Sequence, residues 1–152
     1  MFKLRRYRNS DIYSILKLNR LALQINDPIQ RKKFIEELKN VNKEYIKKNG
    51  EFIVGLLNNK IIGMGALKRL SKKTAELKRM RIHPRYQRSG FGQKILNYLE
   101  KKALKLGYNK IQFYTLHSQK EAQKFYEKNN YNKYRMGSKH GLKAIFYQKK
   151  LK

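Results

Sequence analysis

The stretch that decides the fold is "ELKRMRIHPRYQRSGFGQKIL", residues 76–96. Its first part reads as a strand, its middle as a turn and its end as the start of a helix. The turn carries Gly90 and Gly92 beside Arg85 and Arg88. Glycines let the backbone approach a ligand closely, and the N-terminus of a helix adds positive potential. The stretch therefore predicts a loop that binds a phosphate group.

Three kinds of phosphate-binding loop can be compared with this turn. The P-loop pattern G-x-x-x-x-G-K-[ST] is absent from the sequence. The dinucleotide fingerprint fails twice, because Ile95 stands where a third glycine is needed and Gln112 where an acid is needed. The pattern Gln/Arg-x-x-Gly-x-Gly/Ala is filled by Gln87, Gly90 and Gly92. The alternative is a tight turn that binds nothing.

The strand before the turn changes face along its length. The apolar side chains of residues 74–84 start in one phase and finish in the other: Ala75 and Leu77, then Met80 and Ile82. One inserted residue explains this change, which predicts a β-bulge near Lys78 or Arg79. A bulge leaves backbone groups unpaired, and these can bind an extended ligand. The alternative is a strand that is buried on both faces, where phase carries no meaning.

The rest of the chain predicts a single α+β domain over residues 1–152. Strands arrive in hairpins, one of them turning at Asn58 and Asn59. We expect a mixed, mostly antiparallel twisted sheet with about four helices in the order βααβββαβαββ. The predicted strands span residues 2–7, 51–57, 60–70, 74–84, 110–116, 131–136 and 143–151, and the predicted helices follow residues 9–11, Pro28, Gly90 and His117.

The composition limits the function. The chain has 38 Lys and Arg against 10 Asp and Glu, a net charge of +28. Such a charge suits nucleic acid, a membrane surface or an anionic substrate, or else reflects a lysine-rich compositional bias. There is no cysteine, which excludes disulfides, thiolate metal sites and a cysteine nucleophile. No apolar stretch resembles a membrane span or a signal peptide, so we expect a cytoplasmic protein without membrane insertion.

A resemblance to a known family joins these observations. The segment "ELKRMRIHPRYQRSGFGQKILNYLEKKALKLGY", followed by "AQKFYEKNNY", is similar to the GNAT superfamily of acyl-CoA-dependent N-acetyltransferases. The expected order of elements fits that family over most of the chain. The family carries a bulge in the strand before its loop, at the place where the phase change occurs. Asn130 departs from the family, which prefers glycine there.

The resemblance implies acetyl-CoA as co-substrate and no metal. Loop amides would bind its pyrophosphate, and the backbone of Met80 and Ile82 would pair with its pantetheine arm. The cofactor-binding residues implied in this way are Met80, Arg81, Ile82, Gln87, Arg88, Ser89, Gly90, Phe91 and Gly92.

Two residues are candidates for catalysis. Glu76 is the only acid between Glu51 and Glu100, lies on a central strand and occupies the family's catalytic glutamate position, which implies a general base acting directly or through water. The alternative for Glu76 is a strand residue paired with a lysine. Tyr126 matches the family tyrosine that points at the cofactor sulfur, which implies a general acid; the alternative is a packing residue.

These expectations define one function and one rival. The first is an N-acetyltransferase in which an amine attacks acetyl-CoA directly in a ternary complex, because no cysteine can carry an acyl group. The acceptor is a small-molecule amine or a peptide or protein amine, and a homodimer is possible. The rival is a basic nucleic-acid- or ribosome-binding module on the same fold, with weak or no catalysis.

Overall fold

The computed structural model describes residues 1–23 and 27–152. These residues form one seven-stranded sheet with the strand order β1-β2-β3-β4-β5-β7-β6. Every neighbouring pair of described strands is antiparallel except β4 and β5. The α+β mixed sheet expected from the sequence is therefore confirmed. The strands are β1 (Phe2–Arg6), β2 (Glu51–Leu57), β3 (Lys60–Arg69), β4 (Thr74–Ile82), β5 (Lys110–Leu116), β6 (Asn132–Lys139) and β7 (Leu142–Lys150).

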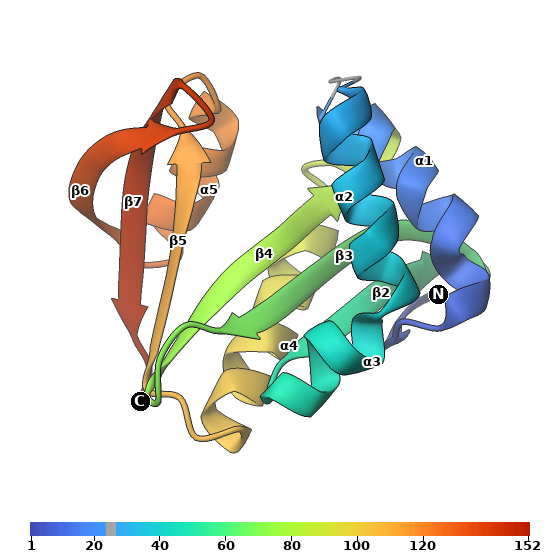
Figure 1. The fold of residues 1–152 in the computed structure, drawn as a ribbon, viewed down its shortest axis with the longest axis horizontal. Coiled ribbons are helices and arrows are strands. Elements are labelled where there is room, and N and C mark those ends of the chain that lie inside the picture. The colour runs from blue at the N-terminus through green and yellow to red at the C-terminus, as the bar shows by residue number, and fades with distance from the viewer. Residues whose placement is uncertain (24–26) are drawn as a thin grey trace.

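Helices cover both faces of the sheet (Figure 1). The helix predicted after Pro28 is divided at Asn40, so the described residues form one short α-helix more than the four expected. The predicted Asn58–Asn59 hairpin turn is confirmed by positive φ angles at both residues, and Asn130, which stands where the family prefers glycine, also has a positive φ of 70° at the end of its helix. The α-helices are α1 (Ile12–Leu23), α2 (Pro28–Lys39), α3 (Val41–Glu44), α4 (Phe91–Lys105) and α5 (Lys120–Lys128), and short 3-10 turns lie at Asn9–Asp11, Ile46–Lys48 and Pro84–Tyr86.

Two apolar cores lie on opposite faces of the sheet. One joins α1, α2 and α3 to β2 and β3, and the other joins α4 and α5 to β3, β4, β5 and β7. In the second core, α4 packs closely on β3 because Gly65 has no side chain there. A Cβ at Gly65 would lie 2.8 Å from side-chain atoms of Ile95, Leu99 and Met80. This contact fixes where the N-terminus of α4 lies relative to the end of β4.

β4 separates from β5 after three residue pairs, from Thr74–Lys110 to Glu76–Gln112. Beyond Glu76 the two strands diverge (Figure 1), and β5 continues to pair with β7 over its whole length. One edge of β4 is thus open from Leu77 onward.

The predicted bulge is present in β4. Met64 pairs with Arg81 and Ala66 with Lys78, so Gly65 alone faces both Arg79 and Met80. Arg79 has a φ of 60°, in the left-handed region. Beyond the bulge, Met80 and Ile82 pack against the α4 core, and Arg81 joins the face of Glu76 and Lys78 that lies toward α1 and α2.

An ion pair fixes the bulge to α2. The guanidinium of Arg79 donates two hydrogen bonds of 3.1 Å to Glu37 and lies 4.1 Å from the centre of the Phe34 ring. The hydroxyl of Tyr45 also donates to Glu37. Burial would raise the pKa of Glu37, but the hydrogen bonds and charge of Arg79 outweigh it and hold that pKa below its ordinary value.

The Glu37 carboxylate should therefore stabilise the fold in a pH-dependent way. Because its pKa is lower in the folded chain, its contribution is present above pH 4.5, its ordinary value, and is lost as the pH falls through the folded pKa. We expect Glu37→Gln to lower the free energy of unfolding at neutral pH by about 1.5–3 kcal/mol. The difference from wild type should shrink below pH 4.5, as measured by urea unfolding at a series of pH values.

Glu36→Gln is the matched control, since Glu36 is exposed on the same helix. It should change stability by less than about 0.5 kcal/mol. A Glu37→Gln difference that stays constant down to about pH 3 would contradict the lowered pKa.

Candidate active site

The glycine turn presents a set of free backbone amides. Gly90 begins α4 with a φ of 86° and provides no side-chain cap. The first hydrogen bond of the helix runs from the amide of Lys94 to the carbonyl of Gly90, at 3.2 Å. Over the described residues, the amides from Arg88 to Gln93 have no backbone or side-chain acceptor. Together with the positive end of the helix, these donors form a site for an anion.

The two glycines of the turn differ in what they require. Gly90 needs its positive φ, which other residues adopt only under strain. A Cβ at Gly92 would make ordinary contacts of 3.6 Å with Ile82 and 3.8 Å with Phe125. Packing alone therefore does not require glycine at residue 92.

The open edge of β4 leads from this turn into the gap between β4 and β5. The amide of His83 bonds to the carbonyl of Ile62 on β3, at 2.8 Å. The backbone N–H and C=O groups of alternate residues in a strand point to the same edge. The backbone groups of Arg81 therefore also point to β3, and those of Met80 and Ile82 point to the gap. The backbone groups of Met80 and Ile82 are thus unpaired by β3, whereas those of Arg81 face β3; cofactor binding by these three residues stays a prediction.

Side chains hold both carbonyls on this edge. The Met80 carbonyl accepts a hydrogen bond of 2.8 Å from Nη1 of Arg81, and the Ile82 carbonyl accepts one of 3.1 Å from Nε2 of Gln87. Gln87 therefore ties the loop to the end of β4. Arg88 and Ser89 are exposed in the loop.

Glu76 lies where the two strands part. It is paired in register with Lys68 of β3 on one side and Gln112 of β5 on the other. Its side chain is half-buried, and among the described residues it makes no side-chain hydrogen bond or ion pair within 4.0 Å. The paired-lysine alternative is not realised at that distance. The carboxylate thus has no side-chain partner among the described residues.

Tyr126, on α5, packs against β5 and lies near enough to Arg81 to feel its charge. Its ring packs 4.3 Å from the ring of Phe113, centre to centre, and only 7% of the residue is exposed. Its hydroxyl bonds to none of the described residues. Burial raises the pKa of the phenol well above its ordinary value, and the nearby charge of Arg81 opposes that rise. Tyr126 therefore stays protonated and able to donate.

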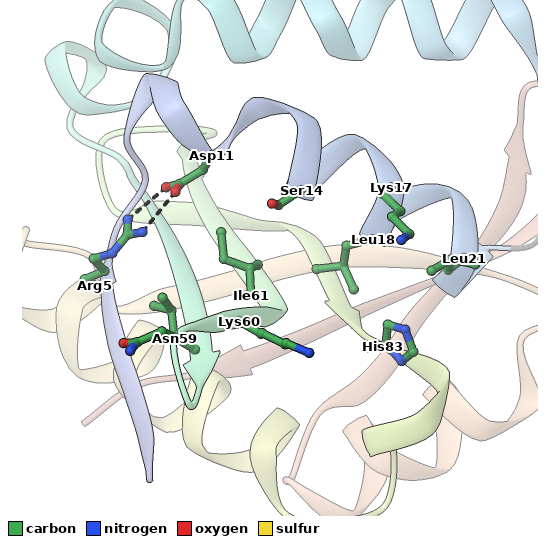
Figure 2. A pocket seen from close by; sticks show the side chains of 11 residues that line it. Arg5, Asp11, Ser14, Lys17, Leu18, Leu21, Asn59, Lys60, Ile61 and His83 are labelled. Atoms are coloured by element: carbon green, nitrogen blue, oxygen red, sulfur yellow. Dashed lines mark hydrogen bonds and ion pairs between the residues drawn. The ribbon is translucent and has the colours of Figure 1, made fainter.

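A separate hollow lies beside α1. It has a volume of about 380 Å³, with the Arg5–Asp11 ion pair at one end and His83 at the other (Figure 2). Neither Glu76 nor Tyr126 lines it, and Asp11 is already bonded to Arg5 at 2.8 and 2.9 Å. The hollow is therefore separate from the two residues that the sequence predicts to be catalytic.

Two features of the site lie beyond the sequence predictions. The contact of Arg79 with Glu37 joins segments far apart in the sequence, and no local pattern indicates it. The position of the Arg81 guanidinium, near Tyr114 and Tyr126, follows from the bulge together with the divergence of β5.

No group of three His, Asp or Glu side chains in residues 1–23 and 27–152 is placed to hold a metal ion. The described helices are too short or too polar to cross a bilayer.

Comparison with known proteins defines the class. Residues 12–131 match the sequence profile of the acetyltransferase (GNAT) family, which is most of the chain. The chain therefore belongs to the GNAT family of acetyltransferases. No curated protein sequence is significantly similar to it.

Solved structures share the whole fold at low sequence identity. A GNAT-family acetyltransferase of Staphylococcus aureus Mu50 is 21% identical, with a TM-score of 0.88 and full coverage of both chains. The PaiA N-acetyltransferase of Thermoplasma acidophilum, solved with coenzyme A, is 19% identical, with a TM-score of 0.80 and 99% of each chain covered. The ribosomal-protein-S18-alanine N-acetyltransferase of Escherichia coli is 18% identical, with a TM-score of 0.82 and coverage of 99% and 94%.

The strain at Gly90 gives a test of the loop. Gly90→Ala should lower stability by about 1–2 kcal/mol, because alanine is strained at this φ. It should also weaken coenzyme A binding about tenfold or more, as measured by calorimetric titration, because relief of the strain moves the amides. Gly90→Asn should have smaller effects on both, since asparagine tolerates the left-handed conformation.

Gly107→Ala provides the control at the other end of α4. Gly107 has a φ of 97° and an equally open environment. The Gly107→Ala variant should lose a similar amount of stability but should bind coenzyme A as tightly as wild type does. Equal losses of affinity at both glycines would show that the loop amides have no particular role.

Proposed function

We propose that this chain transfers an acetyl group from acetyl-CoA to a primary amine, by direct attack in a ternary complex. The observation that carries the proposal is the convergence of three features on one gap. These are the free amides at the start of α4, the open edge of β4, and the unpaired side chains Glu76 and Tyr126. Family membership supports acetyl transfer, and the PaiA structure contains coenzyme A.

The residues present fit acetyl-CoA. The amides from Arg88 to Gly92, with the charge of Arg88, suit a pyrophosphate. The backbone groups of Met80 and Ile82 face the gap, where an extended chain containing amides can pair with them as a strand would. Gln87 holds the loop against Ile82. Acetyl-CoA supplies the activated acetyl group; the protein supplies position and proton transfer.

Glu76 acts as the general base in this proposal. An amine must lose a proton as its nitrogen bonds to the acetyl carbon, and the free carboxylate accepts that proton directly or through a water molecule. Tyr126 acts on the other side of the reaction. As the carbon–sulfur bond breaks, its hydroxyl donates a hydrogen bond to the sulfur, which becomes a thiolate. Its raised pKa favours hydrogen bonding over complete proton transfer.

The setting of the reaction is also part of the proposal. We place it in the cytoplasm, because the chain has no cysteine. Residues 1–152 act as one catalytic domain. Its acceptor is an amine of a small molecule, peptide or protein.

Binding of acetyl-CoA is the first test. A ligand that binds only the folded chain raises its melting temperature. Acetyl-CoA should raise that temperature well beyond ATP at equal concentration and physiological salt. Equal shifts that vanish with added salt would mean that the +28 charge binds any polyanion, and would favour the nucleic-acid-binding module.

Substitution of the two reactive side chains tests the chemistry. Glu76→Gln should lower kcat for an accepted amine by about 100-fold or more, because a positioned base contributes that much. Tyr126→Phe should lower kcat about tenfold or more, through loss of a hydrogen bond to a developing charge. Both variants should keep the melting-temperature shift with acetyl-CoA, and Glu36→Gln should behave as wild type. Normal turnover in either variant rules out the role given to that residue.

A further inference from the structure

Arg81 occupies a particular place in the site. The bulge moves it onto the same face of β4 as Glu76 and Lys78, toward α1 and α2. Its side chain then reaches the mouth of the gap, where Nη1 donates to the Met80 carbonyl. Tyr126 and Tyr114, from the other side of the gap, are close enough to affect its pKa. The guanidinium therefore lies between the two separated strands, on the same face of β4 as the proposed base and five residues further along the strand.

Within the described part of the chain, the Arg81 guanidinium has no counter-ion. No carboxylate of the described chain lies within 4.0 Å of it, and its Nε is buried without a hydrogen-bond partner. Burial and, secondarily, the charge of Arg79 lower the pKa of Arg81 to about 10, where it is still charged at neutral pH. Arg79, the neighbouring half-buried arginine on β4, is by contrast paired with Glu37 through two hydrogen bonds.

The free part of the side chain has a defined shape. Nη1 is bonded to the Met80 carbonyl, whereas Nε has no partner and Nη2 makes no side-chain hydrogen bond to a described residue. The Nε and Nη2 donors of an arginine lie side by side and match the two oxygens of a carboxylate. A half-buried charge without a partner is unfavourable, and a bound carboxylate would offset it.

Further cations lie on β4 and on β6. Lys139 lies over the Tyr114 ring at 5.4 Å, Arg135 lies over the Phe146 ring at 3.8 Å, and Lys78 is half-buried on β4. On this face of β4 among the described residues, Glu76 is the one acid outside an ion pair, since Glu37 is bonded to Arg79. The local field therefore disfavours polyamines and attracts an acceptor that carries negative charge.

We infer that Arg81 binds a carboxylate of the acceptor, so that the substrate is an amine carrying a carboxylate, either a free amino acid or the N-terminus of an acidic peptide. The inference rests on the proposed acetyl transfer. The acceptor would lie along this face of β4, with its carboxylate on Arg81 and its amine toward Glu76. Arg81 is thus a residue that determines specificity, distinct from the proton-transfer groups.

The test uses pairs of acceptors that differ only in the carboxylate. Free L-amino acids are compared with their amides, and short peptides with Asp or Glu near the N-terminus are compared with their Asn or Gln counterparts. The first set tests free amino acids and the second tests acidic peptides. In at least one of these two sets, kcat/KM with acetyl-CoA should be about 10- to 100-fold higher for the acceptor that carries the carboxylate. This is the range for one charge-assisted hydrogen bond.

Three variants separate specificity from structure. Arg81→Met should remove this preference mainly by raising KM, and should keep both the melting temperature and the affinity for acetyl-CoA. Arg81→Lys should recover part of the preference, since it keeps the charge but not the paired donors. Arg31→Met, an exposed arginine on α2, should leave the preference unchanged. If Arg81→Met fails to fold, Arg81→Lys and Arg81→Gln provide the same comparison.

Calorimetric titration of the free protein gives a readout that does not depend on turnover. The preferred carboxylate compound should bind wild type more tightly than its amide does, and Arg81→Met should bind the two equally. If acetyl-CoA fails to bind but this difference persists, the proposed function fails and the carboxylate site stands. If acetyl-CoA binds and amines are acetylated without any preference for the carboxylate, the carboxylate site is overturned and the acetyltransferase stands. Loss of acetyl-CoA binding in Arg81→Met would also overturn the carboxylate site, because Arg81 would then be a residue that binds the cofactor.

Discussion

The bulge in β4 is the constraint on which the rest of the site depends. Gly65 of β3 faces two residues of β4, and the extra residue exchanges the faces of every side chain that follows. The side chains of Met80 and Ile82 then pack on the face covered by α4, while that of Arg81 lies with Glu76 on the opposite face. Arg79 can hold its left-handed conformation because Glu37 and Phe34 of α2 bind its guanidinium. The same arginine therefore stabilises both the bulge and the helix above it.

Close packing of α4 places the free amides of its first turn at the end of the same strand. Ile95 and Leu99 lie so near Gly65 that a methyl group there would force them to move. Because α4 is fixed at its middle against β3, its N-terminus and the free amides around Gly90 lie beside the end of β4. The loop and the open edge of the strand thus form one continuous surface, although the protein makes them from different elements.

Much of this arrangement could be predicted from the sequence. The phase change between Leu77 and Met80 gave the bulge, the two glycines gave the loop, and Asn58 with Asn59 gave the hairpin. These signals are local, since each reflects the conformation or burial of a few consecutive residues. The sequence could not predict that β4 and β5 part after Glu76, or that Glu37 binds Arg79, because both depend on the packing of distant segments. The division of the second helix at Asn40 was missed for a similar reason, since the apolar spacing continues across it.

The short contact between β4 and β5 has a mechanical consequence. Three residue pairs join the strands there, and Glu76 belongs to the last of them. If the two sides of the gap rotate about this contact, displacement grows with distance from it, as along a lever. Ile82 and the loop then move relative to β5 much more than Glu76 does. The gap can widen or narrow at its mouth while the carboxylate, close to the pivot, keeps its position relative to both sides.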